Sequence, residues 1–249
     1  MSFSIARESE LKLEPPEFLC DRVISDKTLD PLPKTAFFGL ISGPAGSGKT
    51  TLMINMLTRR DMYKKAYDNV FLIMPSHSLA SIKDRSFRQH MERSPEHYFE
   101  DLDFDTLEHV RMMTQDAAED GQNSILVMDD VTASLKNREI QTLLKKLIWN
   151  RRHLRLSVII LAQAYIALPP SIRKSISHCW MYKPVNKREI VNVFDELMFL
   201  DRKTADALLR FVYRGPHDLL YAITATQTFH RNFDEIRIGE CDASVGGVV

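Results

Sequence analysis

Residues 43–50 read Gly-Pro-Ala-Gly-Ser-Gly-Lys-Thr and match the pattern G-x-x-x-x-G-K-[ST] of a phosphate-binding loop. Glycine at the first and sixth positions of this pattern leaves room for backbone N–H groups to close around phosphate oxygens. An apolar run precedes the loop at residues 36–42, and residues 52–57 after it suit a helix. This strand–turn–helix context favours a nucleotide site over a glycine turn that binds no ligand.

The residues of this loop have separate expected roles in holding a nucleotide. Lys49 is expected to neutralise the β- and γ-phosphates of ATP, and the hydroxyl group of Thr50 is expected to ligate Mg²⁺. Thr51 then continues the chain into the helix. The predicted nucleotide-binding residues are Gly43, Pro44, Ala45, Gly46, Ser47, Gly48, Lys49, Thr50 and Thr51.

Two adjacent acids, Asp129 and Asp130, close the apolar run that begins at Ile125. An NTPase needs one carboxylate to hold Mg²⁺ and a second polar group to orient the attacking water. We predict that Asp129 holds the metal through water, and that Asp130 occupies the water-activating position that Glu usually fills. The alternative is that both acids only begin a turn and cap the next helix.

The apolar run at residues 156–161 is followed by Gln163 and preceded by Arg151 and Arg152. In a parallel sheet the carboxyl end of this strand lies beside the phosphate site, so Gln163 is placed to sense the γ-phosphate or, alternatively, to bond a neighbouring loop. The two arginines lie at the other end of the strand. They could act only in trans, as an arginine finger that reaches a neighbouring subunit, or they are ordinary surface charge.

Arg173, which follows Pro169 and Pro170, is a second finger candidate. The predicted catalytic residues are Lys49, Asp129, Asp130, Gln163 and Arg152.

Apolar runs alternate with segments of helical periodicity along the chain, which is typical of parallel βαβ units. The remaining predicted strands are residues 69–74, 124–128, 156–161 and 178–182, and the predicted helices include 137–150 and 187–199. A last pair of runs, 218–224 and 227–233, predicts a hairpin at the sheet edge. The predicted fold class is therefore α/β, a three-layer P-loop NTPase with a mainly parallel central sheet.

We expect one ATPase domain at residues 36–238, with 76–120 as an inserted segment of helices and loops. Residues 1–35 are expected to form an extended arm and residues 239–249 a flexible tail. The longest apolar run, 156–168, is shorter than the roughly 20 residues that a membrane span needs, so no membrane partner is expected.

The chain has 33 basic and 33 acidic residues, so its net charge gives no reason to expect strong static binding to nucleic acid. The charges are nevertheless segregated, because residues 136–155 hold seven Lys or Arg and one acid, whereas 83–120 hold eleven acids and five bases. Such segregation suits subunits that meet basic face to acidic face, or a basic surface for a polyanion, or a solvated surface of mixed charge. The three cysteines, Cys20, Cys179 and Cys241, are too far apart to indicate a disulfide framework or a zinc cluster.

This set of motifs resembles the FtsK–HerA superfamily of P-loop motors. Within it, the chain is most similar to the compact genome-packaging ATPases of large double-stranded DNA viruses, the poxvirus-like branch, and of virophages. Asp130 in place of Glu fits this branch but would be a departure for bacterial FtsK. The resemblance covers about residues 36–233 and is carried by Gly43–Thr50, Pro75-Ser76, Asp129-Asp130, Arg152-His153 and Gln163.

The resemblance implies an ASCE-type, RecA-like sheet and an oligomeric ring, commonly a hexamer, that uses ATP and Mg²⁺ to move double-stranded DNA into a capsid. It also implies capsid proteins as candidate partners, and a location inside the infected host, in the viral factory or cytoplasm, or in association with the virion. Two other functions stay open: a nucleotide-gated capsid assembly factor, and a small-molecule P-loop kinase. The kinase would need an arginine-rich lid, for which the sequence shows no convincing segment after the fourth strand.

Overall fold

The computed structural model describes residues 23–238, in which nine strands form one sheet in the order β3-β2-β4-β5-β1-β6-β7-β8-β9. All pairs from β3 to β6 are parallel, and the pairs β6–β7, β7–β8 and β8–β9 are antiparallel. The predicted tail, Cys20, Cys241 and the predicted arm up to residue 22 lie outside the described residues. The structure thus confirms an α/β fold with a mainly parallel sheet and an antiparallel edge.

The strands are β1 (Phe38–Ser42), β2 (Asn69–Ile73), β3 (Tyr98–Phe99), β4 (Ser124–Asp129), β5 (Leu156–Ala162), β6 (His178–Tyr182), β7 (Leu219–Ile223), β8 (Thr228–Arg231) and β9 (Asp234–Ile236). The α-helices are α1 (Lys49–Thr58), α2 (Ser76–Ser81), α3 (Arg85–Arg93), α4 (Phe104–Glu119), α5 (Arg138–Asn150), α6 (Pro170–Arg173), α7 (Lys187–Val193) and α8 (Arg202–Val212). Short 3₁₀ helices are η1 (Pro95–His97), η2 (Ser134–Lys136) and η3 (Tyr165–Ala167), and η4 (Phe194–Met198) is a π-helix.

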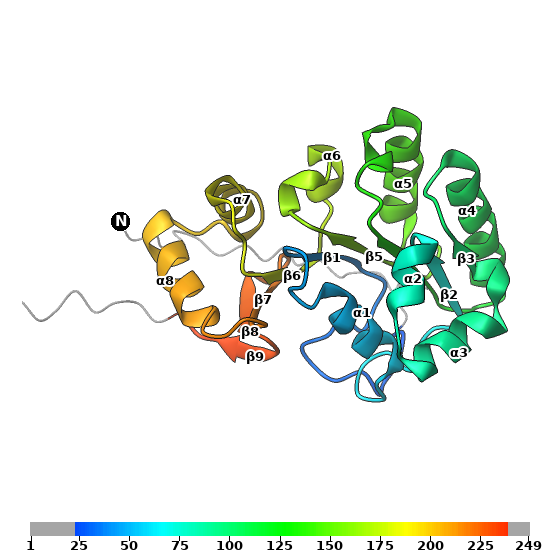
Figure 1. Ribbon diagram of the computed structural model, residues 1–249, viewed down its shortest axis with the longest axis horizontal. Helices are drawn as coiled ribbons and strands as arrows, with labels where there is room; N and C mark the ends of the chain where they lie inside the picture. Colours follow the sequence, from blue (N-terminus) through cyan, green and yellow to red (C-terminus); the bar gives the residue numbers. More distant parts are fainter. Residues whose placement is uncertain (1–22, 239–249) are drawn as a thin grey trace, which may run out of the picture.

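The central strands are buried on both faces, which explains why their sequences are continuous apolar runs rather than alternating ones. In β4, Leu126 and Met128 enter one core while Ile125 and Val127 enter the other. Figure 1 shows α4, α5, α6 and α7 in a row above the sheet, with α1 and α3 below it. The molecule is therefore a three-layer sandwich with a separate apolar core on each face of the sheet.

Some elements differ from those expected from the sequence. The segment 76–120 contains α2, α3 and α4 and also the strand β3, which has only two residues and leaves no apolar run to recognise. The helix expected at 187–199 is α7 followed by the π-helix η4, and it ends at Phe199, whose φ of +47° is left-handed. The expected edge hairpin is present as β7 and β8, with β9 as a third antiparallel strand.

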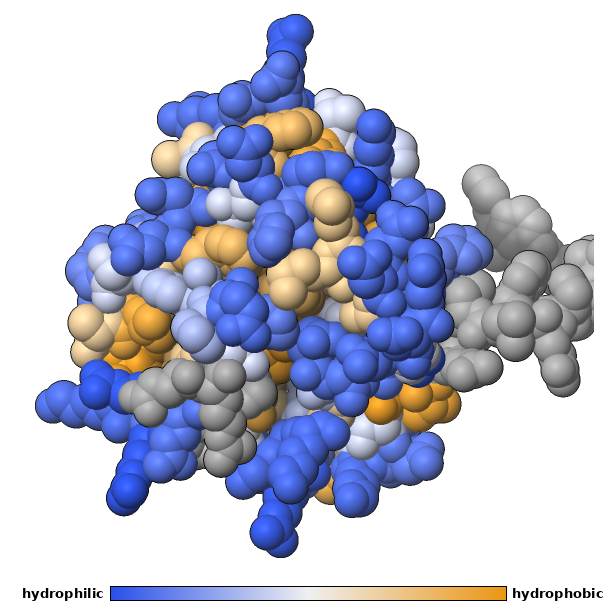
Figure 2. All heavy atoms as spheres, turned by 90° about the vertical axis from the view of Figure 1, so that its right-hand side faces the viewer, coloured by the Kyte–Doolittle hydropathy of each residue, from blue (hydrophilic) through white to orange (hydrophobic). Residues whose placement is uncertain are grey.

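The edge strand β3 is followed by an acidic loop that contains Glu100, Asp101 and Asp103, all exposed. Figure 2 shows the side of the molecule at this end of the sheet, where hydrophilic side chains cover most of the surface and apolar areas are small. A very short strand with charged neighbours offers little for another chain to pair with. This end of the sheet is therefore protected from edge-to-edge association.

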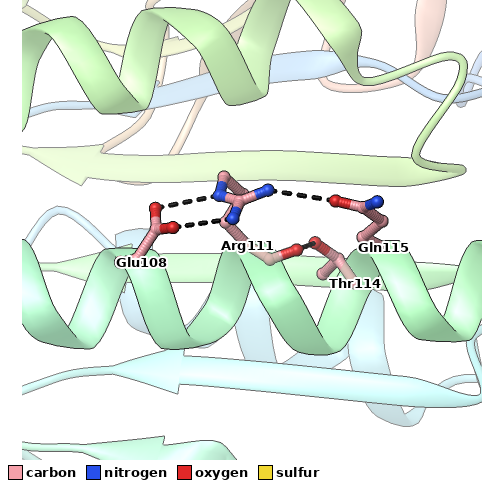
Figure 3. A network of polar contacts seen from close by, with 4 residues as sticks. All are labelled: Glu108, Arg111, Thr114 and Gln115. Atoms are coloured by element: carbon pink, nitrogen blue, oxygen red, sulfur yellow. Dashed lines mark hydrogen bonds and ion pairs between the residues drawn. The ribbon is translucent and has the colours of Figure 1, made fainter.

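Helices α4 and α5 border an open groove of about 1050 Å³. Its α4 wall is held by Arg111, which donates hydrogen bonds to Glu108 and to Gln115, as Figure 3 shows. The hydrogen bond from Arg111 lowers the pKa of Glu108, and the charge of Lys146 on the α5 wall lowers this pKa further. The groove contains none of the residues predicted to bind the nucleotide.

Candidate nucleotide-binding and hydrolysis site

The phosphate loop connects the buried end of β1 to the start of α1, as the sequence predicts. The N–H of Gly43 donates to the carbonyl of Ala162 at 3.1 Å, which ties the loop to β5. A Cβ atom at Gly43 would lie 2.7 Å from Cβ of Tyr182, and Gly48 has a φ of +111°, so neither position tolerates a side chain. The loop thus keeps the backbone conformation and the close approach that a phosphate cradle requires.

The side chain of Lys49 folds back over its own loop. Its Nζ donates to the carbonyl oxygens of Gly43 at 2.8 Å and Pro44 at 3.1 Å. Partial burial lowers the pKa of Lys49, and the nearby charges of Asp129 and Asp130 partly offset that effect. The ammonium group therefore lies at the loop with two carboxylates nearby, and it must release the two carbonyls to bind phosphate.

Asp129 ends β4 directly opposite the start of α1. The hydroxyl of Thr50 donates to Oδ2 of Asp129 at 3.4 Å. Burial raises the pKa of Asp129, and the charge of Lys49 opposes this rise. A hydroxyl and a carboxylate in contact beside a phosphate cradle fit Mg²⁺, which takes few protein oxygens and completes its shell with water and phosphate.

Asp130 and Gln163 lie in the loops that follow β4 and β5. Strand β5 lies between β4 and β1, and its residues Leu161 and Ala162 pair with Asp129 and Ser42. The carboxyl ends of the three strands therefore meet, and both Asp130 and Gln163 are exposed there. This places a second acid and an amide at the same edge as Lys49, where a γ-phosphate and its attacking water would lie.

Arg151 and Arg152 lie between α5 and β5, at the other end of the sheet. The seven residues of β5 correspond to about 20 Å along the strand, so neither side chain reaches the phosphate loop of its own chain. Arg151 donates to the carbonyl of Ile148 at 2.9 Å and is half-buried, and burial lowers its pKa. Arg152 is exposed.

Arg173 is an internal residue. It is 8% exposed and forms a two-bond ion pair with Glu196, with N–O distances of 2.8 and 3.0 Å. Its guanidinium also lies 4.9 Å from the ring centroid of Tyr165. These contacts within one subunit leave the group unavailable to a neighbour, so Arg173 is a poor finger candidate.

Two residues that contact the loop were not found from the sequence. The hydroxyl of Tyr182 donates to the carbonyl of Gly48 at 3.1 Å, and Nδ1 of His217 lies 3.1 Å from the carbonyl oxygen of Ser47. Tyr182 is recognisable as the last residue of a predicted strand, but no motif marks its role. His217 precedes β7 in an irregular loop and carries no signal at all.

Comparison with protein families decides the relationship. The family described as Poxvirus A32 protein matches residues 27–230, most of the chain. The chain belongs to this family. As an A32-family protein it is a viral P-loop ATPase, as its motifs predict. Curated protein sequences give no match.

Solved structures share the fold of this A32-family ATPase at low sequence identity. The genome-packaging NTPase B204 of Sulfolobus turreted icosahedral virus 2, in complex with AMPPCP, is 13% identical, with a TM-score of 0.59 over 82% of this chain and 99% of that chain. B204, the DNA-packaging ATPase of Sulfolobus turreted icosahedral virus, is 14% identical, with a TM-score of 0.58 over the same shares. EssC (ATPases 2 and 3) of Geobacillus thermodenitrificans is 15% identical, with a TM-score of 0.54 over 83% and 41% of the two chains.

The expectations for cysteines and for membrane spans can be compared with the structure of the A32-family ATPase. Cys179 is a free, buried thiol, and burial raises its pKa to about 12. Within residues 23–238, every helix is too short or too polar to cross a membrane.

Proposed function

We propose that the chain is an ATP-hydrolysing motor that translocates double-stranded viral DNA into a capsid. The observation that carries the proposal is the meeting of the phosphate loop, two acids and a strand-end amide at the carboxyl ends of β1, β4 and β5. Membership of the Poxvirus A32 protein family and the shared fold of the B204 packaging enzymes support this use of the site.

Each residue of the site has a proposed part in hydrolysis. Lys49 neutralises charge on the β- and γ-phosphates, and Asp130 orients and deprotonates the attacking water, which Gln163 helps to place. Thr50 and Asp129 would hold Mg²⁺, which supplies further charge neutralisation at the phosphates when it is bound.

We infer that the active assembly is a ring of identical subunits. None of the residues that we assign to the hydrolysis site is an arginine, whereas Arg152 is exposed at the opposite end of β5. A head-to-tail contact between subunits would bring the two ends together, and repeated contacts of this kind form a ring when the rotation between neighbours closes. Six subunits is the number that the family resemblance suggests.

The alternatives are a capsid assembly factor and a small-molecule kinase. A kinase needs arginines in a lid over the phosphates, but Arg173, in the connection that follows β5, points into the protein and pairs with Glu196. An assembly factor would bind nucleotide without responding to DNA. Both the motor and the assembly factor would act in the infected cell, in the viral factory or cytoplasm, or with the virion, and either could contact capsid proteins.

The test is ATP hydrolysis by the assembled protein with and without duplex DNA. Sequence-independent contact with phosphates weakens steeply with salt, so we expect stimulation at low salt that is lost as salt rises. Lys145 and Lys146 on α5 are the proposed DNA contacts, and changing both to Ala should reduce stimulation while basal hydrolysis continues. The matched control changes the exposed Lys27 and Lys64 instead. Turnover that ignores DNA at every salt concentration would favour the assembly factor.

A further inference from the structure

The phosphate loop is anchored from outside its own motif by two side chains. The hydroxyl of Tyr182, at the end of β6, donates to the carbonyl of Gly48 at 3.1 Å. His217, in the connection between α8 and β7, places Nδ1 3.1 Å from the carbonyl oxygen of Ser47. The two anchors lie 134 and 170 residues from their partners in the sequence, so they are purely tertiary contacts.

The carbonyls that these anchors hold are those that must face away from a nucleotide. When successive N–H groups of a loop converge on a phosphate, the carbonyls of the same peptide units point outward. Lys49 occupies two other loop carbonyls, those of Gly43 and Pro44. Once Lys49 turns to the phosphates, these two carbonyls lose its bonds, whereas the bonds to Tyr182 and His217 remain.

Both side chains carry the hydrogen that they need to donate to the loop. A carbonyl oxygen only accepts, so Nδ1 of His217 must carry the hydrogen. Burial raises the pKa of Tyr182 to about 12, so its hydroxyl stays protonated and able to donate at neutral pH. The tyrosine side chain also lies against both glycines, because a Cβ at Gly43 would lie 2.7 Å from Cβ of Tyr182 and a Cβ at Gly48 would lie 3.2 Å from its hydroxyl oxygen.

The anchors lie on one flank of the loop and the hydrolytic residues on the other. Strand β1 has β5 and then β4 on one side, which bring Gln163, Asp129 and Asp130 to the site. On its other side are β6 and then β7, which bring Tyr182 and His217. The γ-phosphate must face the acids, so Tyr182 and His217 support the loop away from the reacting atoms.

We propose that Tyr182 and His217 are positioning residues of the nucleotide site, which hold the phosphate loop in its binding conformation. The inference rests on the nucleotide site of the proposed function and does not depend on DNA. Because the anchors act before and during the reaction alike, their loss should weaken binding of ground and transition states equally. The expected signature is a higher KM and Kd with an unchanged kcat.

The test compares three variants of the full chain in nucleotide binding and steady-state hydrolysis. Tyr182→Phe removes only the hydroxyl and keeps the ring. His217→Gln has its amide nitrogen near the position of Nε2, whereas His217→Asn has it near Nδ1 and so retains a donor to Ser47. We expect Kd for ADP and KM for ATP to rise about three- to tenfold in Tyr182→Phe and His217→Gln, and to stay near the original values in His217→Asn.

Nucleotide-free thermal unfolding serves as the control for folding, and its midpoint should change little in all three variants. Equal affinities in the unaltered chain and all variants would overturn this inference alone. A fall in kcat with unchanged KM would also overturn it, because the residues would then act on the transition state. If the unaltered chain bound no nucleotide, the proposed function would fail together with this inference.

Discussion

At the scale of single residues, Asp129 and Asp130 differ in burial and backbone conformation. Asp129 is largely enclosed and contacts Thr50, whereas Asp130 is exposed and has a φ of +57°. Asp and Asn tolerate this left-handed conformation better than Glu does. The backbone therefore offers a physical reason for the shorter acid at a position where ATPases usually have Glu.

Asp130→Asn should keep the fold and the binding of Mg²⁺ and ATP, because Asn accepts the left-handed backbone and Asp129 is unaltered. We expect kcat to fall about 10²–10⁴-fold, since the group that deprotonates water is lost. The measurement is single-turnover hydrolysis alongside nucleotide Kd. Asp129→Asn is the matched control, in which Mg²⁺-dependent binding should weaken as well. Normal turnover in Asp130→Asn would place the base elsewhere.

His178 makes the stability of the fold depend on pH. Burial lowers the pKa of His178 to about 4, and the nearby charge of Arg151 adds to this effect. In the unfolded chain the pKa is about 6.5, so the unfolded state binds the proton more readily. The contribution of neutral His178 to the free energy of unfolding is complete above pH 6.5. As the pH falls toward 4, the free energy of unfolding decreases by up to about 3 kcal/mol.

His178→Phe should remove this contribution, because Phe retains a ring beside Phe37 and Trp180 but takes no proton. The measurement is the free energy of unfolding in urea between pH 7 and pH 4 for both chains. We expect the unaltered chain to lose more stability over this range, while the carboxylates common to both contribute equally. If the free energies of unfolding of both chains change in parallel with pH, protonation of His178 does not destabilise the fold.

At the scale of elements, the sequence was sufficient for the strands that build the site. Runs such as 124–128 and 156–161 are apolar throughout because both faces of these strands are buried. The meeting of their carboxyl ends at one edge follows from parallel βαβ connections, whereas their order in the sheet was seen only in the structure. Short elements were not predictable in this way: β3 has two residues, α6 has four, and their formation depends on tertiary contacts.

Side-chain contacts between residues far apart in the sequence could not be predicted either. Arg173 was a finger candidate from its position after two prolines, yet it pairs with Glu196 and lies over the ring of Tyr165. The anchors Tyr182 and His217 belong to elements whose neighbours are set by sheet order rather than by local pattern. Residue type and spacing therefore predicted the groups of the loop and the acids, but not the groups that support them.

The ion pair between Arg173 and Glu196 joins α6 to η4, so its loss should destabilise the fold rather than catalysis. We expect Arg173→Ala to lower the free energy of unfolding by about 2 kcal/mol, because a carboxylate is left partly buried without its partner. Arg202→Ala, at an exposed arginine, is the control and should change stability by less than about 0.5 kcal/mol. The measurement is urea unfolding. Full stability with greatly reduced turnover in Arg173→Ala would restore this residue as a finger candidate.

At the scale of the whole molecule, the sheet separates two halves of one proposed catalytic unit. The phosphate loop and the acids lie at the carboxyl edge, and Arg152 lies at the amino edge about 20 Å away. Charge is separated as well, since the acidic loop after β3 lies at the carboxyl edge, whereas Arg151, Arg152 and Arg155, between α5 and β5, lie at the amino edge. Opposite charges on opposite edges favour head-to-tail contacts between copies of the chain.

Arg152→Ala should therefore bind ATP normally but hydrolyse it about 10³-fold more slowly. Mixed assemblies of two variants test whether this loss arises in a neighbouring subunit. Lys49→Ala should fail to bind ATP tightly, because it loses the cation of the phosphate loop. Mixing the two inactive proteins joins an intact loop to an intact Arg152 at about a quarter of the interfaces of a randomly mixed ring. We expect hydrolysis to recover in that mixture.

The control for this experiment is a mixture of Arg152→Ala with the double variant Lys49→Ala/Arg152→Ala, which can form no complete interface. Subunit exchange is followed by mass measurement, so that the two mixtures are compared at equal assembly. Recovery in the first mixture and none in the second requires that Arg152 act on a nucleotide held by another subunit, because neither protein contains a complete site. Absence of recovery despite verified mixing would exclude Arg152 as the trans-acting group, and would leave Arg151, half-buried beside His178, as the next residue to test at this edge.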